Sequence, residues 1–600
     1  MFFSIRIHDD TDETSWQDAV RQHATWLGAD VRLESYAASD GNSIHVAWAA
    51  ARLPEAQPDN PAASGYLTLA TQGCVNPIAG LTTEGHLIRW LTDEQSPVEI
   101  RIGVSLKTGE LLAAVPVAAV EPLCFARCRG GWALSNDVRF LARLTGTELD
   151  EPGVYALLRF GAIPPPMTLF RDVRRVPNGH LLRIGPGSME PAFEMFFHLD
   201  EDFRQKGHVQ DPEARFRETL DGVLAAMPGP VIVYYSGGVD SALVAARLAS
   251  LGRDDFTLVN LAFGADDTAS HLAAEVAAHL GVRYERVAWD ASSISTGLDQ
   301  LGKEYPNVFS DPVTLPGNAL VHASLALMPL AKSAVTGIGA GAAFGQGLPK
   351  YRAWSWVART PKPLRWIGGE AYRVLGLWRY PSRAEQVGNA FRRAMRASPA
   401  QATLAHNAMD GIAYRIPDEA CAEIEEAIRA YTEVLMDGDR CFWDWRSIIH
   451  PIKYCAHEFS AVAQGPLAAR GVVLSQPYAE PAMFRLSASL SQDDKCPDGI
   501  PKGLMKRMLA RSVPAKFVYK PTRAFIPPFR EIFNHPAMRE LLADTVLADS
   551  NPLLEFVRTD RVQEIVGRIQ GRQPICSGAR KVAWALVFAS VWLKQVSGGR

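Results

Sequence analysis

One short stretch, residues 236–241, constrains the fold of this chain more than any other. It consists of Ser236, Gly237, Gly238, Val239, Asp240 and Ser241, and it directly follows the apolar, β-branched run 231–235. A run of this kind suits a parallel strand that is buried on both faces. The glycines permit a tight turn and close approach of a ligand, and the free N–H groups of a helix start bind phosphate. The stretch therefore predicts a strand, a phosphate-binding turn and a helix, with an ordinary strand–turn–helix as the alternative.

The composition limits the classes of protein to which the chain can belong. Its 600 residues are 47% hydrophobic and 21% charged, with a net charge of −3, which indicates a globular protein of roughly two or three domains. This charge gives no reason to expect nucleic acid as the main partner. No apolar run has the length of a membrane span, and residues 1–6 do not resemble a signal peptide. The eight cysteines are scattered, without zinc-ligand spacing, so we expect a cytoplasmic protein with reduced thiols.

The periodicity of the chain predicts an α/β fold of two domains. Residues 1–200 contain short alternating runs separated by turn residues, which is typical of a β-rich domain. A polar linker is expected at 200–212. Residues 211–600 alternate strands with helices before a mainly helical C-terminal third, and this predicts a doubly wound parallel sheet with ligands at the carboxyl ends of its strands. The expected strands are 43–49, 98–105, 111–120, 256–263 and 284–287, and the expected helices include 214–226, 273–280 with Gly281 as its cap, 419–436, 443–463 and 581–596.

Three motifs resemble one known family. The string 236–241 after a hydrophobic strand resembles the pyrophosphate loop of the N-type ATP pyrophosphatases, which cleave ATP between the α- and β-phosphates; it lacks the Gly-Lys-Ser/Thr of a Walker A loop. Residues 122–135 and 170–180 resemble two segments of class II glutamine amidotransferase domains, the second being the strand that closes such a domain. These domains directly precede a synthetase domain in the asparagine synthetase-like family, and the order here is the same.

The resemblance implies a fold and a cofactor. Residues 1–200 would form a degenerate Ntn-hydrolase-like, β-rich domain of the glutamine amidotransferase type. Residues 211–600 would form an ATP-pyrophosphatase domain with the adenine-nucleotide α-hydrolase-like fold, a doubly wound parallel sheet with a helical C-terminal part. ATP and Mg²⁺ are the cofactors that the family uses.

The second residue departs from this family. An active class II amidotransferase domain exposes a cysteine directly after the initiator methionine, and its own α-amine activates the thiol. Phe2 occupies that place here, and none of the first seventy residues is a cysteine. We therefore expect an amidotransferase-like domain that makes no ammonia and serves a structural role, with an active glutaminase as the alternative.

The resemblance also implies which residues bind the nucleotide. In the family the end of the second strand contacts adenosine, which makes Leu261 and Phe263 candidates, although plain core packing would explain Leu261 equally well. A second glycine loop, 333–345, resembles the family's VLSGEGSDEVFGG and keeps its glycines at Gly337 and Gly339.

The acidic residues of that second loop are missing. Ile338, Gly341 and Ala342 stand where the family has glutamate, aspartate and glutamate. The family's aspartate helps to hold Mg²⁺ on the pyrophosphate. Asp240 remains as the expected metal ligand, because a hard cation that bridges phosphates prefers carboxylate oxygens. Water, Asp311 or Asp267 would complete the site.

Cationic residues near the C-terminus are candidates for catalysis. Residues 502–525 resemble the family's segment GKxxKxxLR…P…RxKxxF. Positive charge there would stabilise the transition state and the departing pyrophosphate. The best-matched residues are Lys506, Lys520 and Arg523, although a solvated surface charge would also explain each of them.

A general base is expected on a helix further upstream. Tyr454, His457 and Glu458 are spaced so that they share one helical face. Such a group could deprotonate the amine that attacks the activated carboxyl, and we name Tyr454 and Glu458 as candidates. A buried structural cluster is the alternative.

An unusual insertion at about 350–400 interrupts the second domain. Trp354, Trp356, Trp366 and Trp378 alternate with arginines and lysines, and acids are rare. Basic and aromatic residues can form a stacking platform for single-stranded nucleic acid or grip an acidic or extended peptide. The third possibility is a helical insertion with a solvated basic face and a tryptophan core.

Within the family the chain looks most like a lasso peptide cyclase, which is a macrolactam synthetase. The family's aspartate-recognition residues are replaced by Val473 and Ser475, which argues against a small amino acid as substrate. The resemblance implies that ATP adenylates an Asp or Glu side chain of a precursor peptide and releases pyrophosphate. The N-terminal amine of the peptide, freed by a leader peptidase of the same pathway, then closes an isopeptide ring.

Other functions stay open at this stage. A small-molecule amide synthetase, either an ammonia-dependent asparagine synthetase or a β-lactam synthetase, is the first alternative. A catalytically dead scaffold that binds nucleotide or peptide is the second, because the acids of the loop 338–342 are lost. A nucleic-acid-modifying pyrophosphatase is the third; the expected partners are the precursor peptide and its peptidase, not nucleic acid.

Overall fold

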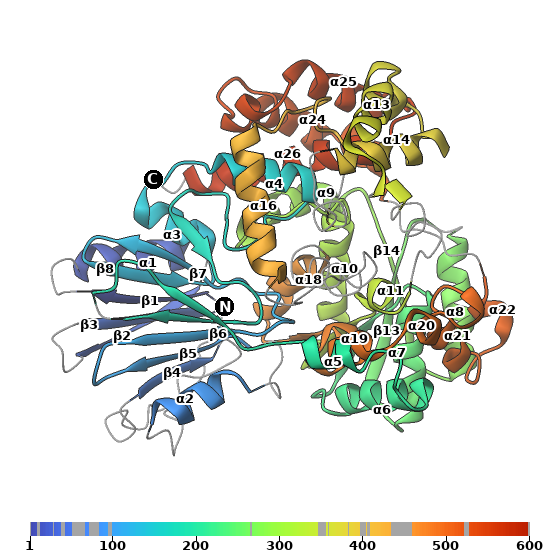
Figure 1. The fold of residues 1–600 in the computed structure, drawn as a ribbon, viewed down its shortest axis with the longest axis horizontal. Helices are drawn as coiled ribbons and strands as arrows, with labels where there is room; N and C mark the ends of the chain where they lie inside the picture. Colours follow the sequence, from blue (N-terminus) through green and yellow to red (C-terminus); the bar gives the residue numbers. More distant parts are fainter. Residues whose placement is uncertain are drawn as a thin grey trace.

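Three β-sheets and a group of C-terminal helices make up the fold in the computed structural model (Figure 1). The structure describes residues 2–8, 13–27, 29–37, 43–50, 66–70, 83–93, 99–185, 187–264, 267–345, 356–357, 359–381, 383–395, 404, 408–433, 459–520 and 527–597.

Two antiparallel sheets form the N-terminal part. The first contains, in order, β2 (Asp30–Ala37), β3 (Ser43–Ala50), β1 (Phe2–His8), β8 (Gly131–Ser135), β7 (Cys124–Cys128) and β9 (Val173–Arg175). The second contains β11 (Ala192–Met195), β10 (His180–Ile184), β6 (Leu111–Val115), β5 (Arg101–Ser105) and β4 (Tyr66–Ala70). A β-rich N-terminal part was expected.

Two expected strands differ in extent. The run 111–120 stops at Val115, because Pro116 starts a turn that the N–H of Ala119 closes. Residues 170–180 do not form one closing strand. They contain the whole of β9 in the first sheet and the first residue of β10 in the second. Gly179, with a φ of 77°, redirects the chain between them.

Side-chain alternation packs the two sheets face to face. Phe3, Ile5 and Ile7 of β1 lie in one hydrophobic cluster with Ile102 and Val104 of β5. Helices α1 (Glu13–Leu27) and α3 (Val138–Thr145) cover the outer face of the first sheet, and α2 (Glu84–Leu91) covers that of the second (Figure 1). The N-terminal part therefore has four layers: helix, sheet, sheet and helix.

The third sheet is parallel throughout. Its order is β14 (Tyr284–Ala288), β13 (Phe256–Ala262), β12 (Val231–Tyr234), β15 (Ser333–Thr336) and β16 (Val473–Ser475). The chain proceeds from β12 toward one edge through β13 and β14, and later adds β15 and β16 on the other side. The boundary between β12 and β15 is therefore the topological switch point, where open α/β sheets bind their ligands.

Helices cover both faces of the parallel sheet. Val231 and Val233 of β12 pack with α6 (Pro212–Ala225), α7 (Val239–Ser250) and α8 (Thr268–Leu280). Ile232 and Tyr234 pack on the opposite face with α10 (Thr314–Leu327) and α18 (Phe459–Ala468). The prediction of an α/β fold with a buried parallel strand before the phosphate loop is confirmed.

Local chemistry fixes the ends of several helices. Asp267 caps α8 by accepting hydrogen bonds from the N–H groups of Ala269 and Ser270, and Gly281 ends the helix with a φ of 69°. The expected linker begins instead with a short helix, α5 (Asp200–Arg204). Its Phe203 is buried against α19 (Pro481–Ser489), so this segment is anchored by an apolar side chain.

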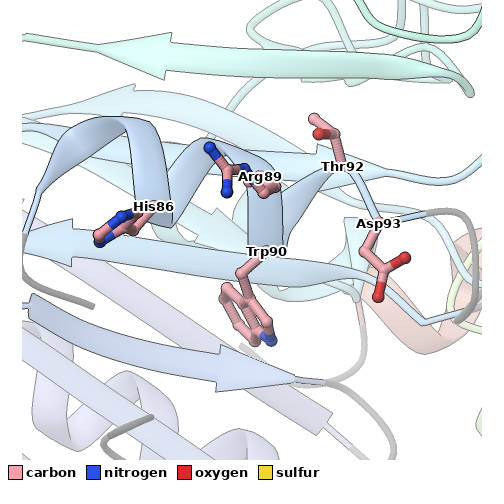
Figure 2. A pocket seen from close by; sticks show the side chains of 5 residues that line it. All are labelled: His86, Arg89, Trp90, Thr92 and Asp93. Carbon is pink, nitrogen blue, oxygen red and sulfur yellow. The ribbon is translucent and has the colours of Figure 1, made fainter. Parts of the chain in front are cut away.

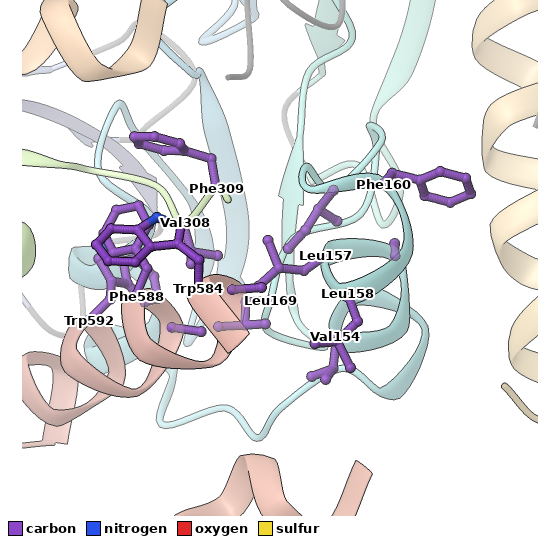
Figure 3. Close-up of a cluster of buried hydrophobic side chains, with 14 of the residues drawn as sticks. Val154, Leu157, Leu158, Phe160, Leu169, Val308, Phe309, Trp584, Phe588 and Trp592 are labelled. Atoms are coloured by element: carbon purple, nitrogen blue, oxygen red, sulfur yellow. The ribbon is translucent and has the colours of Figure 1, made fainter. Parts of the chain in front are cut away.

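A long C-terminal helix, α26 (Ser577–Ser597), joins the N-terminal layers to the rest of the molecule. Its Trp584, Phe588 and Trp592 lie opposite apolar side chains of α4 (Glu151–Phe160) such as Leu157 (Figure 3). Phe588 meets the ring of Phe309 edge-on with centroids 4.8 Å apart. One continuous core therefore spans sequence positions from both halves of the chain.

A buried polar network crosses the same junction. Asp137 accepts hydrogen bonds from the guanidinium of Arg139, and its carboxylate lies 3.1 Å from Nε2 of His23. Arg139 also donates to the carbonyl oxygen of Gly302 in α9 (Ser293–Glu304). Burial alone would raise the pKa of the Asp137 carboxyl, but the charges of Arg139 and His23 hold that pKa well below its usual value.

The remaining described helices complete the C-terminal half. They are α11 (Ala340–Ala343), α13 (Lys362–Val374), α14 (Arg383–Ala394), α16 (Asp418–Glu433), α20 (Gln492–Lys495), α21 (Gly503–Leu509), α22 (Ala515–Val518), α23 (Phe529–Asn534), α24 (Pro536–Leu541) and α25 (Thr559–Gln570). The expected helix 443–463 lies mostly outside the described residues. Among the described helices none is both long and apolar enough to cross a membrane.

Candidate functional site

The phosphate loop joins β12 to α7 at the carboxyl end of the parallel sheet. The hydroxyls of Ser236 and Ser241 lie 3.3 Å apart, and the N–H of Ser236 donates to the Ser241 hydroxyl at 3.2 Å. The N–H of Gly238 donates to the Ser236 hydroxyl at 3.3 Å. Gly237 has a φ of 68°, and a Cβ there would lie 2.8 Å from the Cβ of Ala273. The turn therefore requires glycine at this position.

The N-terminus of α7 begins at this turn. Gly238 is its N-cap, and no side chain caps the helix. The first N–H groups of such a helix carry partial positive charge and bind phosphate groups. The predicted phosphate-binding turn is present in its local geometry: a buried strand, a glycine turn and a 12-residue helix without a side-chain cap.

A buried lysine neutralises the aspartate of this loop. The ammonium of Lys502 donates to both carboxylate oxygens of Asp240, at 2.8 and 2.6 Å. The Lys502 side chain is 10% exposed and that of Asp240 is 26% exposed. Lys502 has a φ of 56° at the N-cap of α21, a left-handed conformation that is uncommon for lysine. The backbone of Lys502 is thus in an uncommon conformation at the position whose side chain contacts the phosphate loop.

Tyr478 also forms a hydrogen bond with Asp240, at its backbone. Its hydroxyl donates to the backbone carbonyl oxygen of Asp240 at 2.9 Å, and the side chain is fully buried. Burial, together with the nearby charge of Asp240, raises the pKa of the Tyr478 hydroxyl well above its ordinary value. The hydroxyl therefore stays protonated and remains a donor that fixes the backbone of the loop.

The second glycine loop lies directly beside the first. A Cβ on Gly337 would be 2.7 Å from the backbone nitrogen of Ser241 and 3.0 Å from the carbonyl carbon of Asp240. Gly339 is the N-cap of α11 and has a φ of 89°. Gly337 lies beside the phosphate loop because the parallel register of β12 and β15 brings the carboxyl ends of these strands together. Binding of the nucleotide by Gly337 and Gly339 stays a prediction.

The end of β13 carries the two candidate adenine-contacting residues. Leu261 is half-buried and packs against two of the hydrophobic clusters. Phe263 lies beside Trp289, with ring centroids 5.8 Å apart, and its N–H donates to Asp267 at 3.0 Å. Leu261 lies in the last part of β13 and Phe263 directly follows this strand, so both are at the strand end where they were expected. Leu261 also has the core contacts of the alternative interpretation.

Lys506 adds a second cation on the same helix as Lys502. Partial burial and the neighbouring charge of Lys502 lower the pKa of Lys506. Its ammonium lies 5.9 Å from the centre of the Tyr519 ring. The next residue in the chain is the predicted Lys520, which is half-buried. Arg523, Tyr454 and Glu458 lie outside the described residues, so the structure places neither the third cation nor the predicted base.

The two acids named as further metal ligands serve other roles. Asp267 caps α8 and also accepts from the N–H of Phe263. Asp311 is half-buried just before α10. Its carboxylate accepts a hydrogen bond from the N–H of Val313, and desolvation raises the pKa of this carboxyl, although the nearby charge of Lys581 opposes that rise. In the described part of the chain, no group of three metal-ligating side chains could hold an ion. Asp240 is therefore the single carboxylate that the phosphate loop offers.

Two residues of the site were not predicted from the sequence. Lys502 was part of the motif that drew attention to Lys506, but its adjacency to Asp240 depends on a contact between residues 262 positions apart. Tyr478 lies in the segment 469–478 that resembles the family, yet nothing in its pattern indicates a hydrogen bond to the loop. The available signal for Lys502 was the Lys-Gly pair at 502–503, because a glycine there interrupts helical periodicity and indicates a helix end.

A separate hollow lies on the N-terminal part. It measures about 590 Å³ and is lined by His86, Arg89, Trp90, Thr92 and Asp93 at the end of α2 (Figure 2). Trp90 packs partly against the hydrophobic cluster beneath α2, and the guanidinium of Arg101 lies 5.3 Å from the centre of its ring. None of the predicted site residues lines it.

Comparisons with known proteins identify a family and several relatives. Residues 216–594 match the family model described as asparagine synthase. Proteins of Mycobacterium bovis and Mycobacterium tuberculosis, each named "Putative asparagine synthetase" of the glutamine-hydrolyzing type, are 31% identical to the chain over 153 residues. That match covers 23% of this chain and 23% of each relative.

Solved structures show only partial likeness. A Methanocaldococcus jannaschii protein described as a "predicted subunit of tRNA methyltransferase" is 25% identical, with a TM-score of 0.14 over 18% of this chain and 51% of its own. Glutamine phosphoribosylpyrophosphate amidotransferase from B. subtilis is 10% identical, with a TM-score of 0.20 over 47% of this chain and 65% of its own.

The family model spans more than half of the chain and includes both glycine loops, Asp240 and Lys502. This chain belongs to the asparagine synthase family.

Proposed function

We propose that this protein is an ATP-dependent C–N ligase that activates a carboxylate as an acyl-adenylate and then forms an amide. The observation that carries the proposal is the phosphate loop at the uncapped start of α7, where the ammonium of Lys502 is hydrogen-bonded to Asp240. Membership of the asparagine synthase family supports the same reaction class. AMP and pyrophosphate are the expected products.

The residues of the loop have separate roles in this reaction. The N–H groups at the start of α7 hold the terminal phosphates, as helix N-termini do. Lys502 and Lys506 lie one helical turn apart and stabilise negative charge on the α-phosphate and the leaving pyrophosphate. Because both ammonium groups are partly desolvated, their interaction with the developing charge is stronger than it would be in water.

Asp240 fits Mg²⁺ as a single protein ligand. Mg²⁺ is commonly held by one or two carboxylates, with phosphate oxygens and water completing its shell. Asp240 would supply this one carboxylate if Lys502 left one of its oxygens free for the ion. Asp267 and Asp311 are not included as ligands, because their carboxylates accept hydrogen bonds from the N–H groups of Phe263 and Val313. Bound Mg²⁺ would neutralise charge on the phosphates.

The described thiols of the N-terminal part do not suit glutamine hydrolysis. Burial raises the pKa of Cys124 to about 12 and that of Cys128 to about 11. A thiol of this kind is almost entirely protonated at neutral pH and is a poor nucleophile. The proposal therefore includes no glutaminase activity and takes the nitrogen from an amine.

A peptide carboxylate is the substrate that we propose, as in a lasso peptide macrolactam synthetase. Val473 and Ser475 lie on β16 beside the switch point, and both are uncharged. Ser475 is buried, so this strand offers no ion pair to the charged groups of a free amino acid. The peptide's own N-terminal amine, freed by a leader peptidase, would close the ring at an Asp or Glu side chain.

Enclosure of the site and proximity of the reacting groups would account for much of the acceleration of amide formation. An amine and an activated acyl group on one peptide react as a single molecule, which contributes on the order of 7–11 kcal/mol relative to separate reactants. The site must also keep water from the adenylate. A small amino acid with free ammonia as nucleophile is the competing substrate pair.

Pyrophosphate release tests the proposal. The purified protein is incubated with ATP and Mg²⁺ and one of three additions: a processed precursor peptide, aspartate with ammonia, or buffer alone. The proposal predicts release that depends on the peptide and is lost in Lys502→Met. Release with aspartate and ammonia alone would assign the protein to small-molecule amide synthesis, and no release with any addition would leave a binding scaffold.

A further inference from the structure

Helix α13 presents an apolar stripe to solvent. We define its outer face as Leu364, Ile367, Ala371, Val374 and Leu375, residues whose spacing places them on one side of the helix. Leu364 and Ile367 are 54% and 57% exposed, and Val374 and Leu375 are 69% and 67% exposed. A contiguous row of large aliphatic side chains at this exposure marks an interaction surface.

A neighbouring side of α13 is already occupied by α14. A Cβ on Gly368 would lie 2.8 Å from the ring of Phe391, and one on Gly388 would lie 2.5 Å from the ring of Tyr372. Tyr372 is 1% exposed. These glycines let α13 and α14 pack closely through their inner sides, so the outer face is a second apolar side that this contact does not use. Figure 1 shows both helices at the periphery, away from the antiparallel sheets.

The segment that contains α13 is rich in cations, and two of them are exposed just before the outer face. Residues 350–396 contain eleven lysines and arginines and two glutamates, in a chain whose net charge is −3. Arg359 and Lys362 are exposed at the start of α13. Glu370 neutralises part of this charge, because Arg373 and Arg392 pair with it at 2.7 and 3.3 Å.

Aromatic side chains border the stripe as well. Trp356 and Trp366 are 63% and 59% exposed, and Tyr380 is 54% exposed, whereas Trp378 is buried. The insertion is thus neither a tryptophan core alone nor a simple solvated basic surface. Exposed Trp and Tyr beside aliphatic residues, with cations around them, are typical of helices that lie in a membrane–water interface.

We propose that the outer face of α13 docks on an anionic phospholipid bilayer. The convex surface of a single helix can insert shallowly into a bilayer, whereas an extended peptide is normally bound in a groove or along a sheet edge. The excess of lysine and arginine supplies attraction to anionic lipid headgroups, which act within about a Debye length of the surface. This inference does not depend on the proposed ligase activity, and it concerns peripheral docking without a membrane span.

Sedimentation with lipid vesicles tests the proposal. The full-length protein is mixed with vesicles of phosphatidylcholine alone or of phosphatidylcholine with phosphatidylglycerol. We expect about tenfold tighter binding to the anionic vesicles, weakened by added salt. Ile367→Asp with Val374→Asp should reduce that binding by about tenfold or more, because two charges enter the buried part of the interface.

Matched controls separate docking from general effects. Leu327→Asp with Leu330→Asp places the same charges on side chains that are 49% and 80% exposed at the end of α10, and it should leave vesicle binding unchanged. Arg359→Gln with Lys362→Gln should weaken binding to anionic vesicles while leaving the thermal midpoint unchanged. A blue shift of tryptophan fluorescence on adding anionic vesicles should shrink in Trp366→Phe.

Several results would overturn the proposal. Equal sedimentation of wild type and the Ile367→Asp, Val374→Asp variant would do so, as would equal binding to the two kinds of vesicle. A concentration-dependent dimer that this variant abolishes would assign the face to a second copy of the chain. Binding of polyglutamate at the same face, with no binding to vesicles, would assign it to an acidic peptide.

Discussion

The ammonium of Lys502 donates hydrogen bonds to both carboxylate oxygens of Asp240, joining the start of α21 to the phosphate loop across 262 positions of the chain. The pair lies at the first turn of α7, beside Gly337 of the neighbouring strand. A single contact thus brings together the predicted phosphate-binding loop and the helix that carries the second cation, Lys506.

Removing the cation should abolish catalysis with little loss of nucleotide binding. Lys502→Met keeps the length of the side chain but removes its charge, and we expect kcat to fall by roughly 10²–10³. Steady-state pyrophosphate release and equilibrium ATP binding measure the two effects separately. Lys516→Met, at an exposed side chain of α22, is the control and should behave like wild type.

A double-mutant cycle tests whether Lys502 and Asp240 act as a pair. Asp240→Asn and Lys502→Met should each lower the free energy of unfolding, and the double variant should lose less than the sum because the two groups contact each other. The coupling energy should be about 0.5–3 kcal/mol. Additive losses in urea unfolding would show that the two side chains do not interact.

Gly337 should not tolerate a methyl group. In Gly337→Ala the new Cβ would lie 2.7 Å from a backbone nitrogen of the phosphate loop, and backbone atoms cannot move aside as a side chain can. We expect weaker ATP binding, measured by calorimetry. Gly222→Ala is the matched control, because its Cβ meets nothing within 4 Å on α6 and should stabilise the helix by about 0.5–1 kcal/mol.

Glu480 should make stability depend on pH. Burial raises the pKa of its carboxyl from 4.5 to about 8. Between these values the folded state binds a proton that the unfolded state has released, so the free energy of unfolding falls as pH rises. The slope from this group is ~1.4 kcal/mol per pH unit at most, and the contribution is complete below the unfolded pKa and lost as pH passes the folded pKa.

Glu480→Gln should flatten this dependence. The amide has nearly the same shape and does not ionise, so the variant should gain relative stability as pH approaches 8. Urea unfolding of both proteins across this interval measures the difference. An unchanged slope in the variant would mean that the carboxyl titrates normally.

The polar network at the junction should be costly to break. Asp137→Ala leaves Arg139 and His23 buried without their shared partner, and we expect a loss of about 3–5 kcal/mol. Asp18→Ala breaks an exposed pair in which Asp18 is 69% and Arg21 53% exposed, and should cost no more than ~1 kcal/mol. Similar losses in the two variants would contradict this account of the junction.

Local patterns in the sequence predicted the local parts of the structure. The apolar run before Ser236, the glycine turn and the cap at Gly281 all depend on neighbours within a few residues, and each lies where it was expected. The strand 111–120 was predicted too long because Pro116 begins a turn inside an apolar run. The fold class followed from the alternation of elements.

Contacts between distant positions could not be predicted in this way. Lys502 meets Asp240 only because α21 packs on α7, and nothing near either residue indicates the other. Asp267 and Asp311 were plausible metal ligands by residue type, but one caps a helix and the other accepts a hydrogen bond from the N–H of Val313. The role of a carboxylate depends on which backbone N–H groups the fold brings to it.

Transfer of oxygen from substrate to nucleotide tests the central claim most directly. A precursor peptide whose acceptor carboxylate carries heavy oxygen is incubated with the protein and ATP, and the released AMP is examined by mass spectrometry. An acyl-adenylate route predicts one heavy oxygen in AMP for each ring closed, with pyrophosphate as the other product. Release of ADP and phosphate, with unlabelled nucleotide, would contradict the assignment of the loop at Asp240 to adenylation.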